Sequence, residues 1–343
     1  MLMNKIEVTV IIPTYNGSNT ISRALHSLTN QTYKSFEVIV VDDNGKGSNR
    51  QKQTEIEVMK YSQSLDLKYL VHEKNLNGAA ARNTGLKEAN GDFICFLDDD
   101  DVYLKDRLLK ATNILKKNKS ADLLFCAVLI QRNGKLVNIV RPHNASNMQR
   151  ELLLNTALFG TGSNIFMRRE ILNKVGGFNE KYFRRQDNEF LLRALEDGTY
   201  IMTNDIDIVK CNSGVLNLPS YEKMRISNEL YYNDFKKLID SFNEEDYTLF
   251  QQKERAWLLF CCMMREKQEI IEEAKTALLE YRNLKVSEKI QYSMAKIKFK
   301  NSNLLYYIQP QMSKVRNEMK SRRIRKKLTK DMENQLLELN IIN

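Results

Sequence analysis

The chain has 343 residues, of which 42% are hydrophobic and 28% charged, a composition typical of a globular protein with one large domain or two. Its 4 prolines and 13 glycines argue against a long disordered linker. The formal net charge of +10 is concentrated near the C-terminus, because residues 313–330 carry nine basic side chains and one acidic one.

The cysteine pattern and the hydropathy predict a reduced, cytoplasmic setting. The five cysteines form no CxxC pair, and two of them, Cys261 and Cys262, are adjacent, which disfavours a disulfide between them. No signal-peptide pattern precedes the first predicted strand. The longest apolar run, 256–264, is shorter than the roughly 20 residues that span a bilayer. We therefore expect a cytoplasmic protein that is soluble or peripherally attached to the inner face of the cell membrane.

Strand and helix patterns alternate through the first hundred residues. Runs of β-branched residues predict parallel strands, and apolar residues that recur every three to four positions predict amphipathic helices. The predicted strands are Val8–Ile12, Phe36–Val41, Lys68–Val71 and Phe93–Leu97, and the predicted helices are Ile21–Leu28 and Ala79–Glu88. This βαβα rhythm predicts an α/β fold with a parallel, doubly wound core.

The alternation continues less regularly further along the chain. The predicted elements are a helix at Leu104–Lys117, a strand at Leu123–Gln131 that ends at the turn Asn133–Gly134, a short helix at Arg168–Asn173 and a helix at Glu189–Glu196. From about Tyr221 the strand patterns vanish and helical periodicity continues to the end. We place a boundary near residue 218, between an α/β domain in residues 1–218 and a helical region in residues 219–343 that contains the basic segment 313–330.

Four consecutive aspartates, Asp98 to Asp101, follow the fourth predicted strand. Crowded carboxylates repel one another unless a cation relieves the repulsion, and hard oxygen ligands favour Mg²⁺ or Mn²⁺. Ligands of open α/β sheets bind just outside the carboxyl ends of the strands. The alternative is that an aspartate caps a helix beginning near Val102, and we assign that role to Asp101. For the first three aspartates the pattern favours a divalent ion that holds a phosphorylated substrate.

Two more strand tips carry short polar residues, Pro13–Gly17 after the first strand and Asp42–Gly45 after the second. Such residues accept hydrogen bonds from a base or a ribose, although they are also common turn formers. Three polar tips on one edge of a sheet favour a nucleotide site over turns alone. Arg82 is expected near the same edge, either bound to a diphosphate or in an ion pair with Asp42 or Asp43.

Several other patterns exclude functions or leave alternatives open. The segment Gly45–Ser48 lacks the earlier glycine of a P-loop, and no GxGxxG follows the first strand, so an ATPase of that type and a dinucleotide dehydrogenase are disfavoured. Asp187 precedes an apolar helix, where its position favours an N-cap over a general base toward a sugar hydroxyl. The loop Gly160–Asn164 has small residues that could border a substrate. We interpret His26, His72 and His143 as structural or surface residues.

Six motifs occur together in one order over about 200 residues. They are VTVIIPTYNG (8–17), EVIVVDDNG (37–45), NLNGAAARNTGL (75–86), FICFLDDDDVY (93–103), VGGFNE (175–180) and RRQDNEFLLRA (184–194). In this combination the chain resembles a family-2 glycosyltransferase of the bacterial polysaccharide or cell-envelope type. The resemblance implies the GT-A fold, a Rossmann-like, mixed and mostly parallel sheet with flanking helices. It ends near residue 215, so it says nothing about the helical C-terminal third.

The resemblance also implies roles for particular residues. The base and ribose of a nucleotide would lie against Pro13, Tyr15, Asn16 and Asp43, with Asp42 and Arg82 bracing this pocket and Asn77 and Asp99 among the donor-binding residues. The DxD element of the family falls on Asp98 and Asp100, which would bind Mn²⁺ or Mg²⁺, Asp100 most directly. Asp187 matches the catalytic base, in preference to the cap that its position alone suggests. Gln186 stands where many members have a second acid.

The implied activity is inverting, metal-dependent transfer of a hexosyl or N-acetylhexosaminyl group from a nucleotide-sugar donor, with UDP as the default nucleotide. The acceptor would be a hydroxyl of a glycan, lipid-linked or cell-envelope molecule. The rival hypotheses are a nucleotidyltransferase acting on a sugar phosphate and a non-catalytic sugar-binding protein. The basic segment would meet an anionic membrane surface, or be a solvated helix face or an oligomer contact between the C-terminal helices. We expect no nucleic-acid partner.

Overall fold

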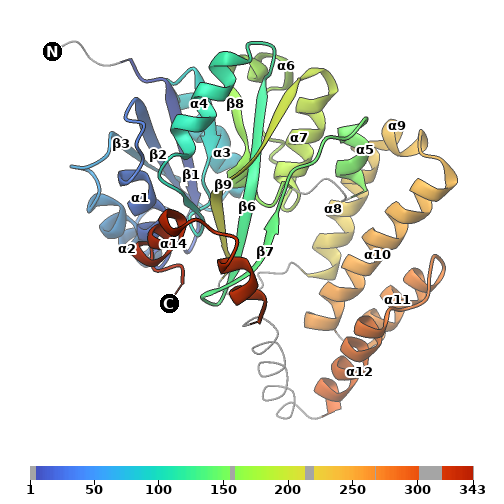
Figure 1. Cartoon of the computed structure of the whole chain (residues 1–343). Helices are drawn as coiled ribbons and strands as arrows, with labels where there is room; N and C mark the ends of the chain where they lie inside the picture. The colour runs from blue at the N-terminus through green and yellow to red at the C-terminus, as the bar shows by residue number, and fades with distance from the viewer. Residues whose placement is uncertain (1–4, 155–158, 213–219, 267, 301–318, 343) are drawn as a thin grey trace. The chain divides into compact units, whose positions relative to one another are not determined.

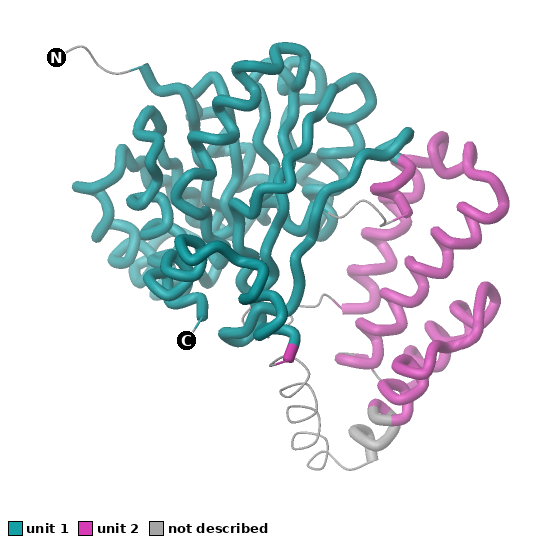
Figure 2. The backbone as a smooth tube through the Cα atoms, in the orientation of Figure 1, with its two compact units in different colours: residues 1–149, 158–214, 320–343 teal, residues 150–157, 215–319 magenta. Residues whose placement is uncertain are grey.

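The computed structural model describes residues 5–154, 159–212, 220–266, 268–300 and 319–342. The chain forms two compact units, coloured separately in Figure 2. Unit 1 contains residues 1–149, 158–214 and 320–343, and unit 2 contains residues 150–157 and 215–319. The boundary expected near residue 218 falls outside the described residues.

Unit 1 is built on one nine-stranded sheet in the order β3-β2-β1-β4-β8-β6-β9-β5, with β7 paired to β6 (Figure 1). Its strands are β1 (Val8–Thr14), β2 (Phe36–Asp42), β3 (Leu67–Val71), β4 (Phe93–Phe96), β5 (Val102–Tyr103), β6 (Leu123–Arg132), β7 (Lys135–Val140), β8 (Phe166–Arg168) and β9 (Tyr200–Asn212). Strands β1 to β4 are parallel, as are β6 and β9, whereas β5, β7 and β8 run antiparallel to their neighbours. The sheet is therefore mixed and mostly parallel, as predicted.

Helices cover both faces of this sheet because the central strands are apolar on both sides. Helices α1 and α4 pack on the face that presents Val8, Val10 and Ile12. On the other face a side chain at Gly85 would lie 2.4 Å from Ile11 Cγ2, so the glycine lets its helix approach β1 closely. The helices of unit 1 are α1 (Ile21–Thr29), α2 (Asn49–Met59), α3 (Gly78–Glu88), α4 (Arg107–Lys117), α6 (Leu172–Val175), α7 (Gln186–Asp197) and α14 (Lys330–Glu338), with short 3₁₀ turns η1 (Gly162–Asn164) and η2 (Arg169–Ile171).

The predicted helix at Leu104–Lys117 begins later than expected. Val102 and Tyr103 form β5, because they pair with Val209 and Ile208 of β9. The helix itself starts at Arg107. The short apolar segment after the four aspartates is thus used as an edge strand, and the prediction of a helix beginning near Val102 is wrong.

Unit 2 is helical, as the periodicity after Tyr221 predicted. It consists of α8 (Tyr221–Asp234), α9 (Lys236–Asp240), α10 (Glu244–Arg265), α11 (Gln268–Leu279) and α12 (Val286–Lys300), and α5 (Met148–Leu153) runs from unit 1 into it. Its core lies between α10 and α11 around Leu259, Ile271 and Leu278. Among the described residues, no helix is both long enough and apolar enough to cross a membrane.

The last part of the chain does not belong to the helical region in which the sequence analysis placed it. Residues 320–343 are part of unit 1. Leu336, Leu339 and Ile341 are buried in a cluster with Val102 and Leu129 of the sheet. The Gln335 side-chain oxygen also accepts a hydrogen bond of 3.0 Å from the backbone of Lys105. The apolar edge formed by β5 and β9 is thereby covered by the C-terminus itself.

Replacing Leu336 with alanine is expected to lower the free energy of unfolding of unit 1 by about 2–5 kcal/mol, because this fully buried side chain would leave a cavity. The neighbouring Leu337, which is 46% exposed, supplies the matched control, and its alanine variant is expected to change stability by less than about 0.5 kcal/mol. Urea unfolding of both variants checks the prediction. Equal effects would mean that the C-terminal segment does not pack as described.

Candidate active site

The three polar strand tips lie side by side at one edge of the sheet. Thr14 at the end of β1 is in register with Asp42 of β2, and β4 pairs on the other side of β1. The Thr14 hydroxyl donates a hydrogen bond of 2.5 Å to Asp99. A Cβ atom on Gly17 would lie only 1.9 Å from the Asp99 carboxylate, so only glycine fits there. The edge predicted from parallel topology is therefore a single site.

Asp43 holds the loop that leads into α3. Its buried carboxylate accepts hydrogen bonds from the backbone of Leu76 (2.8 Å) and Asn77 (2.9 Å) and from the side chain of Asn75 (2.8 Å), and it lies 2.8 Å from His72 Nδ1. These partners occupy both carboxylate oxygens. Asp43 thus shapes the expected nucleotide pocket through the loop that it holds, and His72 is structural as predicted.

Asp42 is also buried, and its partners differ from those expected. Its carboxylate accepts hydrogen bonds from the Tyr69 hydroxyl (2.6 Å) and the Asn44 backbone (2.8 Å). Burial raises the pKa of Asp42, and the Tyr69 hydrogen bond opposes that rise. The expected pair between Arg82 and Asp42 or Asp43 is wrong, because the described contacts of Arg82 lie elsewhere.

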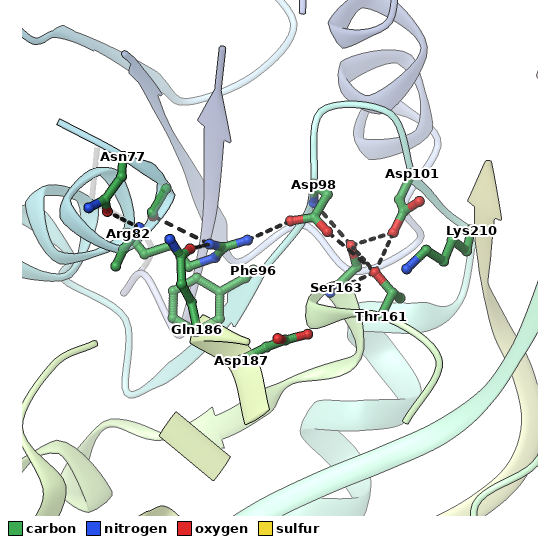
Figure 3. Close-up of polar contacts among 12 residues, drawn as sticks. Asn77, Arg82, Phe96, Asp98, Asp101, Thr161, Ser163, Gln186, Asp187 and Lys210 are labelled. Atoms are coloured by element: carbon green, nitrogen blue, oxygen red, sulfur yellow. Dashed lines mark hydrogen bonds and ion pairs between the residues drawn. The ribbon is translucent and has the colours of Figure 1, made fainter. Parts of the chain in front are cut away.

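Arg82 connects the acidic loop to α7. Its guanidinium donates a hydrogen bond of 2.7 Å to Asp98 and one of 3.0 Å to the Gln186 side chain (Figure 3). It also lies over the Phe178 ring. The carboxylate attracts the cation, and the ring of Phe178 stabilises its face. Two motifs about 100 residues apart, one with Arg82 and one with Gln186, are thereby joined.

The remaining residues of the expected nucleotide pocket lie at the end of β1 and at the start of α3. Tyr15 is 47% exposed beyond the end of β1, where Pro13 pairs with Val41. Asn16 has a positive φ of 60°, which asparagine tolerates, and its backbone donates to the Asn44 side chain. Asn77 caps α3, since its side-chain oxygen accepts from the backbone of the first turn.

Asp101 is not a helix cap. It is buried, and one of its oxygens accepts hydrogen bonds from the hydroxyls of Thr161 (2.8 Å) and Ser163 (2.7 Å). Its other oxygen accepts from the backbone of Cys211, at 3.1 Å. Ser163 also accepts a hydrogen bond of 3.0 Å from the backbone of Asp98. Asp101 therefore ties the acidic loop to the small-residue loop 160–164, whose place beside the site agrees with the sequence.

Removing the Ser163 hydroxyl is expected to loosen this connection. A Ser163→Ala variant leaves a buried carboxylate oxygen and a backbone N–H short of a partner, at a cost of about 1–3 kcal/mol in unfolding free energy. Urea denaturation measures the change, with Ser64→Ala on an exposed turn as the control. Identical stability of the two variants would show that the Ser163 bonds contribute nothing.

The other aspartates carry crowded negative charge. Burial raises the pKa of Asp99 to about 6, against the opposing Thr14 hydrogen bond, and the charge of Asp98 adds to the rise. Burial and the charges of Asp98 and Asp99 raise the pKa of Asp100 as well. Within the described residues, no three His, Cys, Asp or Glu side chains surround a common metal position. The carboxylate oxygens and their mutual repulsion nevertheless fit a hard divalent cation.

Asp187 faces the same space from α7. Arg185, with a φ of 62°, precedes the helix, so Asp187 lies inside the first turn and is not the N-cap. A Cβ on Gly162 would lie 3.7 Å from the Asp187 carboxylate and 3.7 Å from Arg82 Nη2. Figure 3 shows the carboxylate directed toward the loop that carries Thr161 and Ser163. Asp187 and the Arg82–Asp98 pair therefore border one space.

Lys210 is a site residue that the sequence did not predict. It lies on β9, and its ammonium donates a hydrogen bond of 3.1 Å to the backbone of Gly160. Its charge opposes the rise in the pKa of Asp100 and of Asp101. Recognising 200–212 as a strand parallel to β6 would have brought Lys210 to this edge.

Comparisons with known proteins agree with this fold. The sequence model described as glycosyl transferase family 2 matches residues 9–176. The amylovoran biosynthesis glycosyltransferase AmsB of Erwinia amylovora is 33% identical over 198 residues, 56% of this chain and 65% of AmsB, so the match spans slightly less than two thirds of that protein. The Escherichia coli UDP-Glc:alpha-D-GlcNAc-diphosphoundecaprenol beta-1,3-glucosyltransferase WfgD is 30% identical over 210 residues, 61% of this chain and 75% of WfgD.

Two solved structures share the fold at low sequence identity. TarS 1–349 of S. aureus in complex with UDP-GlcNAc superimposes with a TM-score of 0.50 at 20% identity, over 86% of this chain and 92% of that one. The mannosyltransferase PcManGT of Pyrobaculum calidifontis, in complex with GDP-Man and Mn2+, gives 0.50 at 18% identity, over 88% and 89%. The family match disfavours the nucleotidyltransferase and non-catalytic alternatives. The chain belongs to glycosyl transferase family 2, an enzyme family, and has the GT-A fold.

Proposed function

We propose that this chain is an inverting, metal-dependent glycosyltransferase that moves a sugar from a nucleotide-sugar donor to an acceptor hydroxyl. One observation carries the proposal. Asp187, from α7, lies beside the Arg82 guanidinium that holds Asp98, so a carboxylate free to act as a base borders the acidic loop. Its carboxylate accepts a local hydrogen bond of 3.0 Å from the backbone N–H of Asn188. This arrangement suits proton removal from a hydroxyl positioned next to the departing diphosphate.

The donor is proposed to bind at the strand tips, with UDP as its nucleotide. Tyr15 and Asn16 at the end of β1 and the loop held by Asp43 would contact the base and ribose, and Asp42, Asn77 and Asp99 would keep these segments in place. WfgD is named for a UDP-glucose donor, and TarS binds UDP-GlcNAc in its complex. PcManGT binds GDP-Man, so the base is the part of the donor that needs a direct test.

Asp98 and Asp100 are the residues proposed to hold Mn²⁺ or Mg²⁺. A divalent ion bound there would neutralise charge that develops on the leaving diphosphate. The crowding of Asp98, Asp99 and Asp100 supports this assignment, because a cation relieves the repulsion that raises the pKa of Asp100. The PcManGT complex contains Mn2+, which agrees with such a role.

The protein's own residues would do the rest of the chemistry. Arg82 holds Asp98 in place and gives the acidic loop a fixed position opposite α7. Asp187 takes the proton from the acceptor hydroxyl as its oxygen attacks the anomeric carbon. The attack comes from the face opposite the diphosphate, so a single displacement inverts the configuration and needs no covalent intermediate. The loop Thr161–Ser163, which Asp101 holds in place, borders the space between Asp187 and the acidic loop.

The acceptor is proposed to be a growing bacterial polysaccharide or its lipid-linked precursor, handled at the cytoplasmic face of the membrane. AmsB is named for amylovoran biosynthesis, and WfgD for a diphosphoundecaprenol acceptor. Both are glycan-assembly enzymes by name, which supports this acceptor class. Association of this chain through its C-terminal helices remains a prediction.

Nucleotide release tests the proposed function. The purified chain with Mn²⁺ is incubated with a panel of nucleotide sugars, and nucleoside diphosphate is measured against an enzyme-free blank. Release of UDP from one UDP-sugar, increased by a polysaccharide or lipid-linked acceptor, is the expected result. A thermal-shift screen of the same panel identifies the donor, because a ligand of the native state raises Tm. Release from no donor, with no thermal shift, would refute the proposal.

A further inference from the structure

The C-terminal part of unit 1 carries a dense group of basic side chains. Residues 320–330 contain seven basic residues and no acidic one. We call this group the basic ledge, and its members are Lys320, Arg322, Arg323, Arg325, Lys326, Lys327 and Lys330. All of them except the partly buried Arg325 are exposed. The ledge is thus a surface of strongly positive charge.

Apolar and polar contacts fix the ledge to the catalytic unit. Ile324, inside the ledge, is 9% exposed and packs in the cluster that contains Leu336 and Val102. The Ser321 hydroxyl accepts a hydrogen bond of 3.2 Å from the backbone of Leu136. Just beyond the ledge, Asp331 pairs with Lys105 at 2.8 Å. The apolar side chains of this segment are therefore used inside unit 1, and its basic side chains face solvent.

The ledge lies at the same edge of the sheet as the donor site. Strand β8 is antiparallel to both β4 and β6, so β4 and β6 end on the same side. Leu136, which contacts Ser321, lies just after the turn that follows β6, and Lys105 lies four residues after Asp101. Figure 1 shows the dark red residues before α14 near the end of β6.

We propose that the basic ledge binds the anionic headgroups of a membrane surface and so turns the donor-site edge of unit 1 toward that surface. Clustered Lys and Arg near an anionic bilayer are attracted through the surface potential. Because Ile324 and Leu336 are buried in unit 1, the attachment is electrostatic, without insertion of an apolar helix face. The benefit to catalysis, access to a lipid-linked acceptor, rests on the proposed function; the membrane binding does not.

A nucleic acid fits this surface less well than a lipid membrane. Single-stranded RNA and DNA are bound by basic grooves that also carry aromatic side chains on which bases stack. Residues 319–343 contain no Phe, Tyr or Trp. An electrostatic contact with headgroups requires only exposed basic charge, which is what the ledge provides.

Vesicle sedimentation tests the proposal with the full chain. The ledge variant replaces Arg322, Arg323, Lys326 and Lys327 with glutamine, which leaves the buried anchors in place. A matched control replaces four exposed lysines near the opposite end of the strands, Lys87, Lys117, Lys119 and Lys174, with glutamine. Both lose the same charge, so a difference between them depends on where the charge lies.

The wild type and the control variant are expected to bind phosphatidylcholine vesicles containing phosphatidylglycerol, but not pure phosphatidylcholine, and to be released as salt rises. The ledge variant is expected to bind at least roughly tenfold more weakly. Release of nucleoside diphosphate in detergent solution should be the same in all three. Equal binding of the two variants, binding to neutral vesicles, or stronger binding to single-stranded RNA at the same salt would overturn the proposal. Because sedimentation uses no nucleotide sugar, its result stands apart from failure of the proposed activity.

Discussion

An Asp187→Asn variant is expected to transfer sugar about 10²–10⁴ times more slowly than the wild type, the loss typical of removing a general base. The amide has nearly the same shape as the carboxylate but cannot accept the proton of the acceptor hydroxyl. Asp187 makes no described contact with the strand tips proposed to hold the nucleotide, so the affinity for UDP should remain within about twofold. Steady-state kinetics and calorimetric titration with UDP and Mn²⁺ measure the two quantities.

Asp197→Asn, at the exposed C-terminal end of the same helix, is the matched control and should keep wild-type turnover. If Asp187→Asn also keeps it, Asp187 is not the base. A loss of UDP affinity as large as the loss of turnover would instead assign Asp187 to donor binding.

An Asp100→Ala variant is expected to lose the part of UDP binding that depends on Mn²⁺. Burial and the neighbouring charges of Asp98 and Asp99 raise the pKa of Asp100, so a cation beside its carboxylate would relieve the repulsion. Without it, Asp98 remains paired with Arg82 and is the only carboxylate left of the proposed metal pair. Calorimetry with UDP in the presence and absence of Mn²⁺ should give the same weak affinity for the variant.

Asp66→Ala, which removes an exposed aspartate before β3, controls for the loss of one negative charge. In that variant and in the wild type, Mn²⁺ should strengthen UDP binding, and a chelator should reverse the effect. If Mn²⁺ still strengthens UDP binding to Asp100→Ala, then Asp100 is not the principal metal ligand.

The first four strands, and the meeting of the polar residues that follow them at one edge, were predictable from the sequence. Val8–Ile12 and Phe36–Val41 are rich in β-branched residues, a pattern typical of parallel strands covered on both faces, and the structure buries both strands inside the sheet. Because parallel strands end on one edge, the polar residues after them had to meet. Asn133 and Gly134 likewise form the predicted turn, both with positive φ.

The partners of the charged residues were not predictable in the same way. Arg82 was expected to bind a diphosphate or to pair with Asp42 or Asp43 at the same sheet edge, yet it contacts Asp98 and Gln186. Asp101 looked like a helix cap, but Thr161 and Ser163 supply its hydrogen bonds. Each of these contacts joins residues that the sequence separates, so local propensity contains no information about them.

By itself, the sequence determined the α/β core, the family and the edge where the chemistry is expected, since apolar periodicity and strand-tip composition are local properties of the chain. Only the tertiary structure decided that residues 320–342 return to unit 1 and that Lys210 reaches the acidic loop. The first depends on the apolar surface of β5 and β9, which has to be covered only after segments a hundred residues apart have paired. The second depends on the pairing of β9 with β6, which sets Lys210 opposite Ile130. Burial of the apolar surface of β5 and β9 places the C-terminal helix on unit 1, whereas its helical periodicity alone would allow either unit.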